Sequence, residues 1–270
     1  MTDDELVRFA RRLRLDVLEM AHLSHESHIG SALSIADIIA VLYGCILKYD
    51  VNDPRWEGRD RFVLSKGHAC SVLYAALAEV GFFPKEELLR QSEDGALLSG
   101  HVSSSVPGVE CSTGSLGHGI CVSNGMALAG KLKKSYYRVF CIVGNGECEE
   151  GSVWECAWFA TQHRLDNFWV IVDQNDLQGM GESKNILDSD GLAYKWTAFG
   201  WNVQEVDGND IGQLVSALFS AREEKRPHCV IAHTVKGKGV SFMEGDTVWH
   251  YRDPQGAFYT NAKKELEAVT

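Results

Sequence analysis

The stretch Arg138–Val143 (RVFCIV), with the polar Gly144–Glu147 (GNGE) that follows it, decides the fold of this chain. A second apolar run, Phe168–Val172 (FWVIV), lies further along and ends in Asp173–Asn175 (DQN). Residues 151–163, between the two runs, have helical character. Two all-apolar strands joined by a helix are typical of a βαβ unit, in which the strands are parallel and buried on both faces.

Strand and helix patterns alternate on both sides of this unit. On the C-terminal side we expect a strand at 201–206, a helix at 210–224 and a strand at 228–234. On the N-terminal side Arg61–Ser65 is a candidate strand and 69–80 a candidate helix. This alternation predicts the α/β class, with three layers (α/β/α) and a mostly parallel sheet that helices cover on both faces.

The remaining segments predict further helices and one long loop. Residues 3–23 carry apolar side chains at helical spacing, and a second helix is expected from Ser34 to Leu47, with Ser34 as its N-cap. Residues 92–115 are rich in Ser and Gly and predict an irregular loop, before a helix of small residues at 117–132. Loops of this length are uncommon unless they are functional.

The composition excludes several classes of protein. The chain has 270 residues, 45% of them hydrophobic, and no linker divides it, so we expect a single domain over residues 1–270. A net charge of −11 disfavours binding to nucleic acid or to an anionic membrane surface. We find no apolar run of about 18 residues and no secretory signal. Eight cysteines without a CxxC pair are typical of reduced thiols in a cytoplasmic protein.

Polar clusters follow three of the expected strands. They are Gly144–Gly146, Asp173–Asn175 and His233–Gly239. In open parallel sheets ligands bind beyond the carboxyl ends of the strands. The glycines of the first cluster allow a phosphate to approach backbone N–H groups, and the second cluster offers oxygen atoms of the kind that Mg²⁺ prefers. Each cluster alone also fits a plain turn, but their combination on adjacent strands favours a site for a metal and a diphosphate.

Histidines in Gly/Ser-rich loops are the second signal of a site. Five of the ten histidines of the chain lie in such loops: His28, His68, His101, His118 and His250. Together they predict a polar pocket with hydrogen-bond donors for hydroxyl or phosphate groups. They lack the HExxH spacing of a zinc site.

With these clusters in place, the sequence resembles the transketolase family. Gly144-Asn145-Gly146 followed by Asn175 is similar to the thiamine diphosphate signature, Gly-Asp-Gly and then Asn about 30 residues on. Other segments resemble transketolases in the same order along nearly the whole chain: Ser27–Ser34 (SHIGSALS), Leu64–Ala69 (LSKGHA), Pro107–Glu110 (PGVE), Ser112–Gly117 (STGSLG), Thr234–Phe242 (TVKGKGVSF) and Trp249-His250. The resemblance implies the thiamine diphosphate-binding fold, and in particular its diphosphate-binding module.

The resemblance also implies roles for individual residues. The implied Mg²⁺ ligands are Asn145 and Asn175, through side-chain oxygens, and Leu177, through its carbonyl. His28, His101 and His250 are expected around the reacting groups of a ketose, and Glu150 at a subunit interface near the activating Glu of the partner. The implied cofactor-binding residues are His68, Gly114, Ser115, Leu116, Gly144, Gly146, Glu147, Asn175 and His250.

Three residues depart from the family pattern. Asn145 stands where the family has Asp, which keeps an oxygen ligand but removes a negative charge. His118 stands where the family has Gln, and Tyr251 follows His250 where the family has Gly. These changes leave the donor and the acceptor of the reaction open.

The resemblance implies a function for the chain as one part of a larger enzyme. We expect the N-terminal subunit of a split, Mg²⁺- and thiamine diphosphate-dependent transketolase, which transfers a two-carbon ketol unit from a ketose to an aldehyde acceptor. A separate C-terminal subunit is expected to supply the pyrimidine-binding domain and its activating Glu, in an α2β2 assembly. The alternatives are a non-catalytic scaffold or regulatory subunit, and a subunit of a 1-deoxyxylulose-5-phosphate synthase-like or 2-oxo-acid-decarboxylating thiamine enzyme.

Overall fold

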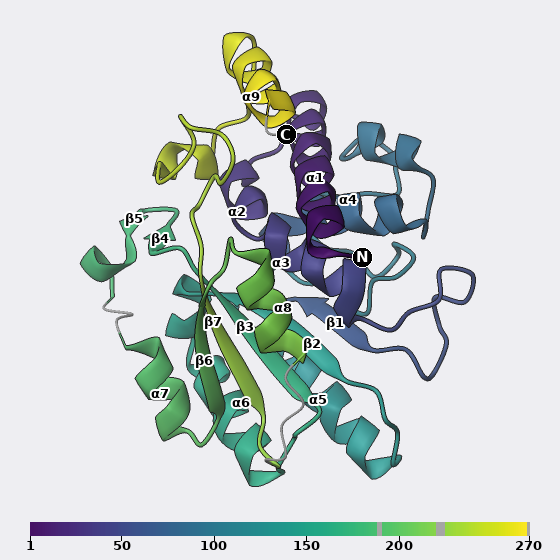
Figure 1. Cartoon of the computed structure of the whole chain (residues 1–270), viewed down its shortest axis with the longest axis vertical. Helices are drawn as coiled ribbons and strands as arrows, with labels where there is room; N and C mark the ends of the chain where they lie inside the picture. Colours follow the sequence, from purple (N-terminus) through teal and green to yellow (C-terminus); the bar gives the residue numbers. More distant parts are fainter. Residues whose placement is uncertain (188–190, 220–224, 269–270) are drawn as a thin grey trace.

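The computed structural model describes residues 1–187, 191–219 and 225–268. Within these ranges five strands form one sheet, parallel throughout, in the order β1-β2-β3-β7-β6 (Figure 1). The strands are β1 Arg61–Leu64, β2 Val139–Gly144, β3 Phe168–Gln174, β6 Asn202–Asp207 and β7 His228–His233. The short strands β4 (Leu177–Gln178) and β5 (Gly181–Glu182) form a separate antiparallel hairpin. The predicted parallel α/β fold is confirmed.

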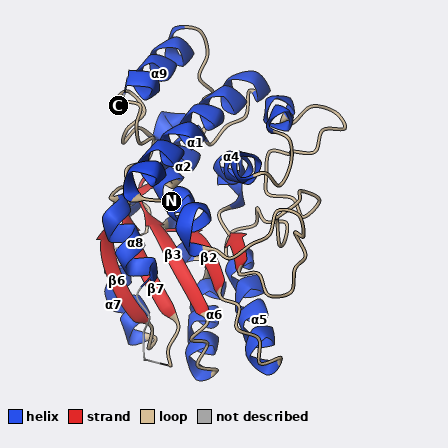
Figure 2. Ribbon diagram, turned by 45° about the vertical axis from the view of Figure 1, so that its right-hand side comes forward, coloured by secondary structure: helices blue, strands red, loops and turns tan. Residues whose placement is uncertain are grey.

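Helices cover both faces of this sheet (Figure 2). One face packs against α1 Asp3–Ser24, α2 Ile29–Ser34, α3 Ala36–Val41, α4 Cys70–Val80 and α8 Ile211–Phe219. The other face packs against α5 His118–Leu132, α6 Gly151–Gln162 and α7 Leu192–Ala198. The last helix, α9 (Ala257–Ala268), lies beside α1 at the top of Figure 1.

Alternation of side chains along the strands explains the two cores. In β2, Phe140 and Ile142 point into the core that contains α1 to α4, while Cys141 and Val143 point into the core that contains α5 and α6. All four are fully buried. A strand that must fill a core on each face has no polar position, which is why this stretch reads as a continuous apolar run.

The structure corrects the helix expected from Ser34 to Leu47. Helix α2 begins at Ile29 and ends at Ser34, α3 follows at Ala36, and residues Leu42–Ile46 form a short π-helix. Ser34 is not an N-cap: its hydroxyl is buried and donates to the carboxylate of Asp173, at 2.6 Å. A buried carboxylate requires hydrogen-bond donors, and this requirement outweighs the local capping preference of serine.

Most other segments agree with expectation to within one or two residues. Residues 92–115 contain no helix or strand, as the prediction of a long loop requires. The helix expected at 210–224 is described as α8 as far as Phe219, and 220–224 lie outside the described residues. The sequence pattern did not predict α7, α9 or the β4–β5 hairpin. No helix in the described ranges is both long enough and apolar enough to cross a membrane.

Candidate functional site

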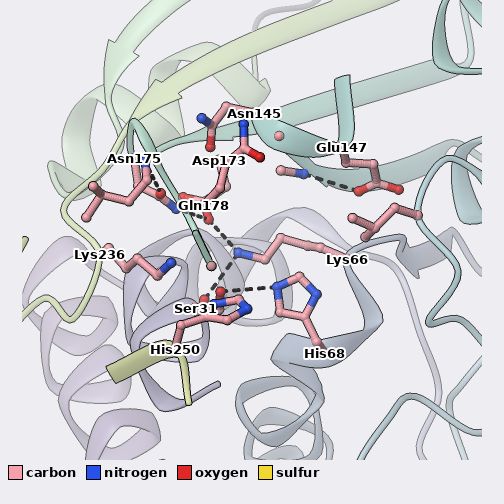
Figure 3. A pocket seen from close by; sticks show the side chains of 15 residues that line it. Ser31, Lys66, His68, Asn145, Glu147, Asp173, Asn175, Gln178, Lys236 and His250 are labelled. Atoms are coloured by element: carbon pink, nitrogen blue, oxygen red, sulfur yellow. Dashed lines mark hydrogen bonds and ion pairs between the residues drawn. The ribbon is translucent and has the colours of Figure 1, made fainter. Parts of the chain in front are cut away.

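A cavity of about 180 Å³ lies at the carboxyl ends of β2 and β3 (Figure 3). Gly144 pairs with Asp173 in the sheet register, and Gln174 pairs with His233, so the three polar clusters end side by side. The expectation that the clusters Gly144–Gly146 and Asp173–Asn175 follow adjacent strands is confirmed. The residues that line the cavity are Ser31, Lys66, His68, Leu116, Gly144, Asn145, Gly146, Glu147, Asp173, Asn175, Leu177, Gln178, Gly179, Lys236 and His250.

Asp173 is a buried anion at the floor of the cavity, and its carboxylate is fully engaged within the protein. It accepts hydrogen bonds from the hydroxyls of Ser34 and Thr234 and from the side-chain amide of Asn175, the last at 2.8 Å. It also forms an ion pair with Lys66, whose ammonium group donates to the carbonyl of Ser31 as well. Because these partners use its oxygens, Asp173 holds Lys66 and Asn175 in place.

Lys66 and Lys236 are two buried cations in one small cavity, each only 2% exposed. The ammonium group of Lys66 is paired with Asp173, whereas that of Lys236 has no hydrogen bond or ion pair within the described residues. Burial and, to a lesser extent, the charge of Lys66 lower the pKa of Lys236 to about 8, while Asp173 opposes the shift. Since an unpaired buried ammonium group is unfavourable, the cavity is suited to an anion.

The predicted oxygen ligands face these cations across the cavity. Asn145 is 2% exposed, and its side-chain N–H donates to the hydroxyl of Ser183 at 2.6 Å. Asn175 accepts the N–H of Leu177 at 3.1 Å through its side-chain oxygen. Figure 3 shows Asn145 and Asn175 on one side of the cavity and His68 and His250 on the other, with the lysines between them. Within the described residues, no three His, Cys, Asp or Glu side chains group as a metal site, so a cation would depend on amide and carbonyl oxygens.

Glu147 braces the wall of the cavity. Its carboxylate accepts hydrogen bonds from the Ser65 hydroxyl and from the backbone N–H groups of Gly117 (2.8 Å) and Gly144 (3.2 Å). Burial raises the pKa of Glu147, although these hydrogen bonds lower it. Glu147 therefore joins the end of β2 to the loop that precedes α5, so that Leu116 is held at the cavity.

Four of the five loop histidines come together beside the cavity. The ring of His28 lies 4.7 Å from that of His250, 5.1 Å from that of His68 and 5.9 Å from that of His101. The backbone also ties them, since the N–H of His28 donates to the carbonyl of His250 at 2.9 Å. His118 is exposed at the start of α5 and is not part of this group, so the prediction of a shared pocket was wrong for that residue.

Three of these histidines, His28, His68 and His250, are neutral at physiological pH. Burial, followed by the charge of His101, lowers the pKa of His28 to about 4. Burial and the nearby Lys236 lower the pKa of His250 to about 3. The pKa of His68 lies well below 6.5, because it is buried next to Lys66. A neutral imidazole offers one donor and one acceptor, so these three side chains can bind hydroxyl and phosphate oxygens without a net charge of their own.

Some predicted site residues lie outside the cavity itself. A Cβ atom added to Gly114 would lie 3.1 Å from the ring of His101, and Ser115 is exposed in the loop that leads into α5. His101 is exposed, with its carbonyl held by the hydroxyl of Tyr74. Glu150 is an exposed residue immediately before α6. The positions of Gly114, Ser115 and His101 extend the site outward from the cavity, and Glu150 stands on the surface.

The residues present fit a magnesium diphosphate group. Lys66 and Lys236 supply positive charge, and the asparagine oxygens and the Leu177 carbonyl supply hard ligands. A polar atom, Nδ1 of His250, is buried without a hydrogen-bond partner among the described residues. A Cβ atom on Gly146 would come within 2.9 Å of Gln178, so a larger residue would fill this part of the cavity. Fold and site together define a diphosphate-binding α/β domain of the thiamine diphosphate-dependent class.

Comparison with known proteins identifies the family within this class. The family described as transketolase, thiamine diphosphate binding domain, matches residues 2–261. This chain belongs to the transketolase family, and it is the thiamine diphosphate-binding, N-terminal part. The predictions of the family, of this cofactor and of a transferase of the transketolase type are confirmed.

Several relatives are similar to this chain in length. It is 39% identical over 254 residues to an apulose-4-phosphate transketolase subunit of Phocaeicola vulgatus, covering 94% of this chain and 90% of that subunit. It is 40% identical to the 6-deoxy-6-sulfo-D-fructose transketolase subunit of a Clostridium species, and the match covers 89% of this chain and 88% of that subunit. The transketolase of Campylobacter jejuni superposes with a TM-score of 0.88 at 29% identity over 98% of this chain, which spans 42% of that enzyme.

The sequence interpretation missed the charged floor of the cavity. Ser31, Lys66 and Lys236 line the cavity but were given no role of their own, and Asp173, in a cluster expected to offer oxygen atoms to a metal, is instead paired with Lys66. A signal was present for the lysines: each lies in a Lys-Gly turn at the end of a candidate strand, next to residues that were assigned to the site. A lysine in a turn is usually exposed, so burial was needed to distinguish them.

Proposed function

We propose that this chain acts as the cofactor-binding subunit of a Mg²⁺- and thiamine diphosphate-dependent enzyme that moves a two-carbon ketol unit from a ketose to an aldehyde acceptor. The observation that carries the proposal is the group of histidines, with neutral His28, His68 and His250 among them, beside a cation-lined cavity. Neutral donors suit the hydroxyl and carbonyl groups of a sugar, and the buried cations suit a diphosphate. A purely structural subunit would gain nothing from an unpaired buried Lys236.

Each part of the cavity has its own role in this proposal. Asn145, Asn175 and the carbonyl of Leu177 would hold Mg²⁺. Lys66, Lys236 and His68, with the backbone of Gly144 and Gly146, would neutralise and orient the diphosphate. Leu116, in the loop of Gly114 and Ser115, would pack against the organic part of the cofactor, with Glu147 bracing that loop. When bound, thiamine diphosphate would supply the carbanion chemistry of the transfer.

The histidines would act on the substrate. His28, His101 and His250 would donate hydrogen bonds to the carbonyl and hydroxyl oxygens of the ketose and hold it against the cofactor. With pKa values of about 4 and 3, His28 and His250 stay neutral, so each can donate a proton in a hydrogen bond at one nitrogen and accept one at the other. Preorganised donors of this kind stabilise charge that develops on the reacting oxygen.

The proposal includes a second subunit. Relatives of similar length are named as transketolase subunits, and the solved transketolases are more than twice as long as this chain. We therefore propose that residues 1–270 act as one cofactor-binding module, that a separate subunit supplies the pyrimidine-binding domain and its activating Glu near Glu150, and that the assembly is α2β2. All eight cysteines are free thiols, which favours the reducing cytoplasm.

Reconstitution tests the proposed function. The purified chain, its cognate partner subunit, or the mixture of both is assayed with thiamine diphosphate, Mg²⁺, a panel of phosphorylated and free ketoses, and glycolaldehyde as acceptor. We expect ketol transfer only in the mixture, and little from a mixture that contains the His101→Ala chain. Turnover by this chain alone would contradict the need for a partner. A mixture that binds no cofactor at any Mg²⁺ concentration would favour the scaffold alternative.

A further inference from the structure

Asn145 presents a geometric problem that an aspartate at the same position would not have. A carboxylate offers a metal an equivalent oxygen whichever way it is turned. A carboxamide has one oxygen and one NH₂ group, and the wrong orientation would place two N–H bonds against the cation. A site that uses Asn as a ligand therefore needs a device that fixes the orientation of the amide.

Ser183 is placed to be that device. Its hydroxyl lies 2.6 Å from the side-chain nitrogen of Asn145, which donates to it. Both side chains are buried, at 1% and 2% exposure, so water does not compete for this contact. Because the nitrogen is engaged, the side-chain oxygen of Asn145 is the atom that remains to face the cavity. This oxygen has no hydrogen-bond partner among the described residues. The charges agree, because the cavity is lined by Lys66 and Lys236 and favours an oxygen over an NH₂ group.

The β4–β5 hairpin brings Ser183 to this position. Asp176, with φ 59°, turns the chain after Asn175, and β4 and β5 then return it so that the N–H of Ser183 donates to the carbonyl of Asp176 at 2.9 Å. Leu177, whose carbonyl is the third candidate ligand, lies in the same hairpin. The hairpin thus delivers one ligand directly and fixes the orientation of another from 38 residues away.

We propose that Ser183 is a positioning residue for metal binding: its hydroxyl fixes the Asn145 carboxamide so that the side-chain oxygen faces Mg²⁺. This inference rests on the proposed function and adds to it the device that lets an amide replace a carboxylate. It yields a coupling between two positions. Removing the Ser183 hydroxyl should lower the Mg²⁺ affinity when residue 145 is Asn and should change it little when residue 145 is Asp.

A double-mutant cycle tests the coupling. Ser183→Ala, Asn145→Asp and the double variant are each purified with the cognate second subunit. Thiamine diphosphate binding is followed by calorimetry while MgCl₂ is titrated, and unfolding is followed by circular dichroism. In the native background, Ser183→Ala should weaken the apparent Mg²⁺ affinity about tenfold, the effect of one buried hydrogen bond. In the Asn145→Asp background the same change should weaken it by less than about threefold.

Two control variants separate positioning from packing. Ser183→Thr keeps the hydroxyl and should retain the affinity to within about twofold. Ser183→Cys keeps the volume but is a poor acceptor, so it should behave like Ser183→Ala and replaces that variant if it does not fold. The inference would be overturned if Ser183→Ala lowered the Mg²⁺ affinity equally in both backgrounds or not at all in the native background. It would also be overturned if the Thr variant bound Mg²⁺ as weakly as the Ala variant. If the native assembly binds the cofactor with all divalent metal chelated, the proposed metal role fails instead.

Discussion

Lys66 and Lys236 lie in the same cavity, and we expect their removal to change the stability of the cofactor-free chain in opposite directions. Lys236 is buried without a partner among the described residues, and its pKa falls from 10.5 to about 8. Each pKa unit corresponds to about 1.4 kcal/mol, so the charged form is disfavoured by up to about 3 kcal/mol at neutral pH. Substitution by Met removes this unfavourable charge and keeps most of the apolar stem. We therefore expect Lys236→Met to raise the free energy of unfolding by about 2 kcal/mol.

The effect has a defined pH window. The pKa of Lys236 is lower in the folded chain than in the unfolded one, so between about pH 8 and 10.5 the unfolded chain binds more protons. The stability of the native chain then rises with pH over this window, while the variant lacks this contribution. Below pH 8 the unfavourable term is fully present. The gain from Lys236→Met should therefore be largest at pH 7 and should shrink as the pH is raised towards 10.

Lys66→Met is the matched control. Lys66 is equally buried, but it is paired with Asp173, which is itself 0% exposed. Its removal leaves a buried carboxylate without its cation, which typically destabilises a protein by about 3–5 kcal/mol. Urea unfolding of both variants at pH 7 and 9.5, without cofactor, measures the two effects. A Lys236→Met chain that is less stable than the native chain at pH 7, or a gain that does not change with pH, would refute the reasoning.

Three further predictions concern the histidines, the metal ligand and a buried turn. His28→Ala and His101→Ala should each lower turnover of the assembled enzyme by about 10²–10³ while changing cofactor affinity much less, because their rings face the proposed substrate position. Steady-state kinetics measures turnover, and a cofactor titration measures affinity. Loss of cofactor binding with turnover retained at saturating cofactor would contradict the assignment. Asn145→Asp should tighten the apparent Mg²⁺ affinity about tenfold, or about 1.4 kcal/mol, since it restores a negative charge opposite the cation; a magnesium titration of activity that shows no change would argue against Asn145 as a ligand. Gly67→Ala should destabilise the chain by more than about 2 kcal/mol, because the added Cβ would lie 2.5 Å from the carbonyl oxygen of Thr113. Gly125→Ala, on α5 with nothing within 4 Å of the added atom, is its control and should be neutral or slightly stabilising in the same urea unfolding experiment.

The fold could be predicted from the sequence because its determinants are local. The apolar runs of β2 and β3 and the helix between them are each set by residues close in the chain. Once the strands are parallel and adjacent, the carboxyl ends must meet at one edge, so the location of the site follows as well. The grouping of four histidines at this edge could be predicted from the sequence for the same reason. The short α7 and the β4–β5 hairpin lack a long periodic pattern and were missed.

Residues whose partners lie far away in the sequence were interpreted wrongly or not at all. Ser34 has the local features of an N-cap, but its hydroxyl serves Asp173, which lies 139 residues further along. Lys66 has the local features of an exposed turn residue, but it is buried against the same carboxylate, 107 residues away. Local rules assume that a polar residue finds water or its own backbone. That assumption fails where the chain collects polar side chains from distant segments.

The polar floor of the cavity explains why Ser34 and Lys66 were interpreted wrongly from the sequence, and it also explains how the cavity can bind an anion. A buried ion pair of Lys66 and Asp173 contributes little net stability compared with apolar residues of similar volume. The unpaired Lys236 beside it lowers stability outright. Both become favourable only when an anion is present, since the charge of a bound diphosphate offsets the cost of burying the two ammonium groups. The cofactor-free chain should therefore be less stable than its core would allow, and inorganic pyrophosphate with Mg²⁺ should recover part of that stability. The recovery should vanish in Lys236→Met, which separates binding at this cavity from a general effect of the anion.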